Sequence, residues 1–70
     1  MMLTSDLVPV FGPSERGIVK AITRQLRDLG VDAVMLPSDQ VIGRWQAEVP
    51  AADVGTARAI VLRQRAAIAR

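Results

Sequence analysis

Four cationic side chains recur at helical spacing within residues 14–30, and they are Arg16, Lys20, Arg24 and Arg27. On a helix these side chains fall within roughly 80° of one another, on a face that carries no acidic residue. A row of cations along a helix matches the phosphates of a nucleic-acid backbone. The spacing therefore predicts a contact with double-stranded DNA. Two other interpretations stay open, namely a solvated helix surface and a contact with an acidic protein partner.

A second group of cations follows residue 54, where four Arg residues and no acid occur. Arg58 and Arg65 are seven residues apart, so they stack on one edge of a helix. Cations near a helix C-terminus complement the helix dipole, but Arg is also favoured at protein interfaces.

A heptad-like apolar seam runs beside these Arg residues. Trp45 is either a core residue or an interface anchor. The predicted interface comprises Trp45, Val54, Ala57, Arg58, Val61, Arg65 and Ile68.

The residue types that most enzymes and metal sites require are missing from the chain. Histidine and cysteine are absent, which removes the commonest general base, thiolate nucleophiles and the usual zinc ligands. The seven acidic residues are scattered, and no P-loop or glycine-rich dinucleotide turn occurs. We therefore predict a protein that is not an enzyme and that holds no cofactor and no metal.

Length and composition limit how the protein can be stabilised. Seventy residues form one domain at most, and a core this small is marginal without a disulfide, a metal or a partner subunit. Because cysteine is absent, a homo-oligomer is the expected source of stability. The net charge is +2 and half of the residues are hydrophobic, but no apolar run is long enough to span a bilayer. No export signal is visible, so we expect a cytoplasmic protein without membrane contact.

The spacing of apolar residues and the positions of the prolines predict the helices that would position the cations. Residues 1–12 read as an extended arm that lies on the body or on a neighbouring subunit. The first helix is predicted over 13–29, with Gly30 as its left-handed C-terminal residue and Val31 folding back on Leu26 in a Schellman motif.

The second half of the chain is predicted to continue as helix. Segment 31–36 is either a short strand or a linker. A short second helix is predicted over 38–48, capped by Ser38, and a third helix over 50–70. The expected fold is therefore all-α: a small three-helix domain spanning 13–70 that is preceded by the N-terminal arm.

This layout resembles that of the small terminase subunits encoded by phages of high-GC actinobacterial hosts. The matching features are a short apolar arm, a basic first helix ending in LRDLG, a short middle helix after LPSD, and the last helix ARAIVLRQRAAIAR. Members of that family are mostly helical, assemble into rings, engage viral DNA and present it to the large terminase subunit, which holds the ATPase and nuclease. The resemblance implies a homo-oligomer with the same four cations facing DNA and with catalysis in the partner.

Two other classes of function remain open from the sequence. A small regulatory adaptor, antitoxin-like in kind, would bind a protein partner through Trp45 and the N-terminal arm. A structural subunit of a virion would reveal its role only within the full assembly.

Overall fold

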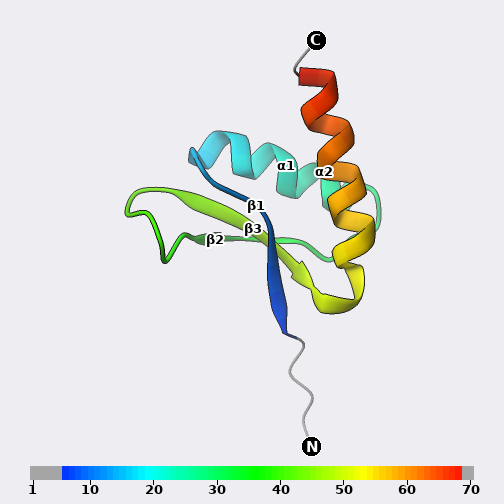
Figure 1. The fold of residues 1–70 in the computed structure, drawn as a ribbon, viewed down its shortest axis with the longest axis horizontal. Helices are drawn as coiled ribbons and strands as arrows, with labels where there is room; N and C mark the ends of the chain where they lie inside the picture. Colours follow the sequence, from blue (N-terminus) through cyan, green and yellow to red (C-terminus); the bar gives the residue numbers. More distant parts are fainter. Residues whose placement is uncertain (1–5, 69–70) are drawn as a thin grey trace, which may run out of the picture.

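The computed structural model describes residues 6–68, and the side chains of residues 6–66, as an α+β fold (Figure 1). The three strands form one antiparallel sheet in the order β1-β3-β2. The predicted all-α, three-helix fold is therefore wrong. The elements are β1 (Leu7–Ser14), α1 (Arg16–Asp28), β2 (Val34–Pro37), β3 (Trp45–Pro50), a short 3₁₀ helix η1 (Ala51–Asp53) and α2 (Val54–Ile68).

The predicted N-terminal arm is an edge strand of the sheet from Leu7 onward. Val8 of β1 pairs with Val49 of β3, and two register shifts follow before Ser14 pairs with Trp45. Pro9 and Pro13 are compatible with this strand because an edge strand need not donate from every backbone N–H. Residues 1–5 of the predicted arm lie outside the described residues.

The predicted short helix over 38–48 is wrong, because β2 and β3 form a hairpin across that region. Ser38 does bind backbone N–H groups, but its Oγ accepts from Gln40 and Val41 in the turn of the hairpin. The strand that follows alternates: Ala47 and Val49 are buried beneath the helices, whereas Gln46 and Glu48 lie on the other face and hydrogen-bond to each other.

The first helix is confirmed within three residues at its N-terminus and one at its C-terminus. Its predicted C-terminal motif is also confirmed. The Gly30 N–H donates to the Arg27 carbonyl and the Val31 N–H to the Leu26 carbonyl, while Gly30 has a φ of 89°. These are the two hydrogen bonds of a Schellman motif, and they turn the chain from α1 toward β2.

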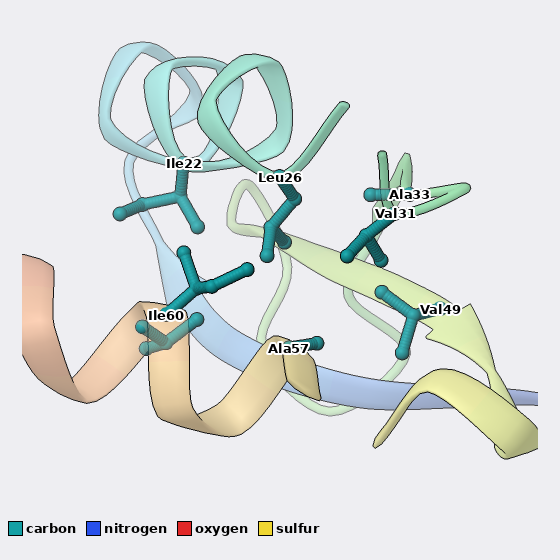
Figure 2. Packing of buried hydrophobic residues seen from close by; sticks show 8 residues of the cluster. Ile22, Leu26, Val31, Ala33, Val49, Ala57 and Ile60 are labelled. Carbon is teal, nitrogen blue, oxygen red and sulfur yellow. The ribbon is translucent and has the colours of Figure 1, made fainter. Parts of the chain in front are cut away.

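Both helices pack on one face of the sheet, and the core lies between them and β3 (Figure 2). Side chains of α1 face side chains of α2, and Val49 of β3 and the loop after α1 close the cluster. The core comprises Ile22, Leu26, Val31, Ala33, Val49, Ala57, Ile60 and Val61.

The helix predicted over 50–70 is also observed, beginning at Val54 after the turn η1. The apolar seam of this helix packs against the rest of the domain. Ala57 and Val61 are buried in the core, and Val54 packs against the core. In the part of the chain that the structure describes, neither helix is long and apolar enough to cross a membrane.

Candidate nucleic-acid interface

Three of the four predicted DNA-facing cations line one hollow of about 420 Å³, which we call the α1 hollow. Lys20, Arg24 and Arg27 line it from α1, and Met35 of β2 lines it from the sheet edge. Thr23, buried between the cations, closes its inner side and donates its hydroxyl to the Val19 carbonyl at 2.8 Å. Of the residues that the structure describes, no acidic one lines this hollow.

Among the residues that the structure describes, the cations of the α1 hollow form no ion pair with an acid. Among the described residues, the one ion pair joins Arg44 Nη1 to Glu15 Oε2 at 3.9 Å, and it is solvent-exposed. Lys20, Arg24 and Arg27 are all exposed. Their charge is therefore available to an external anion.

Arg16, the fourth predicted cation, lies elsewhere. Its guanidinium carbon sits 5.4 Å from the centroid of the Trp45 ring, within the range of a cation–π contact. Trp45 opens β3 and is half-buried. Arg16 therefore covers an aromatic side chain of the domain, and the candidate interface reduces to three cations.

Arg27 has a second role, because its Nε donates a hydrogen bond of 2.7 Å to the Ala33 carbonyl. Ala33 is fully buried in the loop that leads into β2. The contact thus holds the start of β2 against α1 and fixes one wall of the α1 hollow.

Replacing Arg27 with Lys should lower the free energy of unfolding by about 1 kcal/mol, because the ammonium does not reproduce the Nε–H donor at this position. Urea denaturation of both proteins measures the change. The matched control is Lys20→Arg, which also preserves charge and should leave the urea midpoint where it is. An equal midpoint for Arg27→Lys and the parent would contradict a structural role for this hydrogen bond.

One acid lies near the cationic row. Asp28 lines an adjoining hollow of about 500 Å³ together with Lys20 and Arg24. It does not form an ion pair with either cation. The surface of α1 that carries cations without acids therefore ends at Asp28.

The predicted interface residues separate into two groups. Val54, Ala57 and Val61 pack within the domain, and Trp45 is half-buried under Arg16, so these four contact residues of their own chain. Arg58 and Arg65 are exposed and line a second hollow of about 440 Å³, the α2 hollow, whose other wall is residues 9–14 of β1. The side chain of Ile68 lies outside the described part of the chain.

The strand residues that form the facing wall of each hollow are not predicted from the sequence. Residues 9–14 are distant in sequence from α2, and Met35 lies beyond the end of α1, in a strand. The helical spacing finds the cations, whereas the partners depend on the strand pairing.

No family model, no curated protein and no solved structure matches this chain. The resemblance to small terminase subunits stays a prediction, and one of its features, the middle helix after LPSD, is a β-hairpin in the structure.

Proposed function

We propose that the chain is a small non-catalytic protein that binds the phosphate backbone of double-stranded DNA through the α1 hollow. The observation that supports this most is the convergence of three exposed cations on one hollow that no acid lines. From Lys20 to Arg27 the helix rises about 10 Å. One strand of a duplex presents roughly three phosphates over that distance.

The distribution of aromatic residues favours duplex over single-stranded nucleic acid. Proteins that bind single strands stack bases on exposed aromatic side chains. This chain has two aromatic residues, and both are half-buried: Phe11 packs against the core and Trp45 lies under Arg16. Phosphate contacts carry no sequence information, so the proposed binding is independent of DNA sequence.

The proposal includes a cytoplasmic location, where duplex DNA is available, and retains the predicted homo-oligomer. Assembly into a ring and delivery of viral DNA to a large terminase subunit stay predictions that rest on the resemblance alone.

The test is the salt dependence of binding to a short duplex. Three phosphate contacts predict a slope of about −2.7 in a plot of log K against log salt, so affinity should fall about 40-fold between 50 and 200 mM salt. The double variant Lys20→Gln/Arg24→Gln should lose about two units of that slope. Fluorescence anisotropy of a labelled duplex measures both slopes.

The control is Arg44→Gln/Arg63→Gln, which removes the same net charge from exposed positions that line neither hollow. It should keep most of the parent slope. If both double variants lower the slope equally, then binding depends on net charge and the α1 hollow is not the contact. If the parent does not bind duplex DNA at 50 mM salt, the proposed function is wrong.

A role as a protein-interaction module has one observation in its favour. Val41 and Ile42 lie exposed side by side in the turn between β2 and β3, and Ile42 is fully exposed. The sequence predicts this role for the arm and Trp45, but residues 7–12 of the arm belong to β1 and Trp45 lies beneath Arg16. If this function holds instead, Ile42→Ser should abolish binding of the protein partner and leave the affinity for duplex DNA unchanged.

A further inference from the structure

The α2 hollow repeats the chemistry of the α1 hollow on a different part of the domain. Arg58 and Arg65 are both exposed and lie two helical turns apart, a rise of about 10 Å. Within residues 6–66, no acidic residue lines the α2 hollow, and neither Arg forms an ion pair with an acid. Two guanidinium groups at this spacing suit two phosphates of one strand.

The β1 wall of the α2 hollow disfavours an extended peptide as the occupant. A peptide that adds to a sheet edge needs regular backbone donors and acceptors along that edge. Pro9 and Pro13 lack an N–H, and the strand between them carries two register shifts. Such features block strand addition, so the cations are left as the recognition element of this hollow.

The two hollows lie at opposite edges of the sheet. In the strand order β1-β3-β2, β1 walls the α2 hollow and Met35 of β2 walls the α1 hollow. The central strand β3 lies between the two edge strands that wall the hollows (Figure 1). One straight duplex that occupies either hollow therefore leaves the other hollow open.

From this arrangement we infer that one copy of the domain holds two DNA duplexes at once, one in each hollow, and so bridges them. The inference rests on the proposed function, because it takes the α1 hollow as the first duplex site. The α2 hollow offers two cations against three, so it is the weaker site and limits bridging. Bridging should therefore disappear at a lower salt concentration than binding to a single duplex.

A two-duplex capture experiment tests the inference at 50 mM salt. A biotinylated duplex is fixed to streptavidin beads, the protein is added, and a second, fluorescent duplex is supplied in solution. The amount of retained protein reports binding to the first duplex, and the retained fluorescence reports bridging. The parent protein should retain both.

The variant Arg58→Gln/Arg65→Gln should remain on the beads but retain at least tenfold less fluorescent duplex than the parent. Lys20→Gln/Arg24→Gln should lower retention of the protein and of the second duplex together. Arg44→Gln/Arg63→Gln, which carries the same charge change, should behave as the parent in both readouts. Circular dichroism of each variant confirms that the fold is retained.

Three outcomes would overturn the inference. If the parent is retained but no second duplex is, the α2 hollow does not hold DNA, and the proposed function stands without it. If Arg58→Gln/Arg65→Gln bridges as well as the parent, then bridging comes from an oligomer with one site per copy. If the parent is not retained on the beads, the proposed function fails and the inference fails with it.

Discussion

Replacing Leu26 with Ala should lower the free energy of unfolding by about 3–4 kcal/mol. Leu26 is completely buried at the centre of the core, where it meets α2 and β3 (Figure 2). A chain of this length has a total stability of only about 4–10 kcal/mol. The variant should therefore populate the unfolded state at moderate temperature, and its urea midpoint should fall by a third or more. Urea denaturation followed by circular dichroism measures this.

The matched control is Leu62→Ala on α2, which makes the same chemical change at a side chain that is 65% exposed. Its stability should stay within about 0.5 kcal/mol of the parent. If Leu26→Ala costs no more than Leu62→Ala, the core does not lie where the structure places it. A small cost that rises on dilution would instead indicate that subunit contacts supply most of the stability, as expected for a marginal chain.

The helices could be predicted from the sequence because their determinants are local. The apolar stripe of α1 and the pair Gly30–Val31 define a helix and its end within one short segment. The same spacing places Lys20, Arg24 and Arg27 on one side of α1 and Arg58 and Arg65 on one edge of α2. The cations of both hollows are therefore readable without any knowledge of the fold.

β2 falls largely within the segment 31–36 that the sequence leaves open as a strand, but β3 is not predicted because two patterns compete in residues 38–50. Val41, Ile42 and Trp45 are spaced as on one face of a helix, and that spacing supported the wrong prediction. The stretch WQAEVP alternates strictly, and this period of two is the signal that the structure follows. Gly43, with a φ of 82°, lies in the turn of the hairpin, where a residue in the left-handed region is tolerated.

The walls of the hollows could not be predicted from the sequence at all. Whether Met35 lies beside α1, and whether residues 9–14 lie beside α2, depends on the order of the strands. Strand order is set by long-range packing. In this chain the N-terminal segment forms the edge strand β1, which pairs with β3. Local periodicity contains no information on that choice.

The position of the cations has a structural consequence besides the proposed binding of DNA. Both hollows lie beside an edge strand, and charged side chains at a sheet edge oppose pairing with the edge of another molecule. The two roles have different signatures. Loss of DNA contacts lowers the salt slope of binding, whereas loss of edge protection makes the variant self-associate. Light scattering of Lys20→Gln/Arg24→Gln in the absence of DNA separates them.

Replacing Gly12 with Ala should lower the free energy of unfolding by about 2–4 kcal/mol, because the site is closed to a side chain in two ways. A Cβ at Gly12 would lie 2.6 Å from the Trp45 carbonyl oxygen and 3.0 Å from the Gln46 Cα, both backbone atoms of β3. Gly12 also has a φ of 106°, which L-residues rarely adopt. Relief of the overlap requires β1 to move away from β3, so the loss should be measured by urea denaturation and by faster amide exchange in β3.

Two other glycines separate the steric effect from the conformational one. Gly30 has a φ of 89° but open space where a Cβ would stand, so Gly30→Ala should cost only about 1 kcal/mol. Gly17 lies within α1 with open space around it, so Gly17→Ala should raise stability by about 0.5–1 kcal/mol. In order of decreasing stability, we expect Gly17→Ala, the parent, Gly30→Ala and Gly12→Ala. If Gly12→Ala is as stable as Gly30→Ala, β1 does not pass this close to β3, and the β1 wall of the α2 hollow is misplaced.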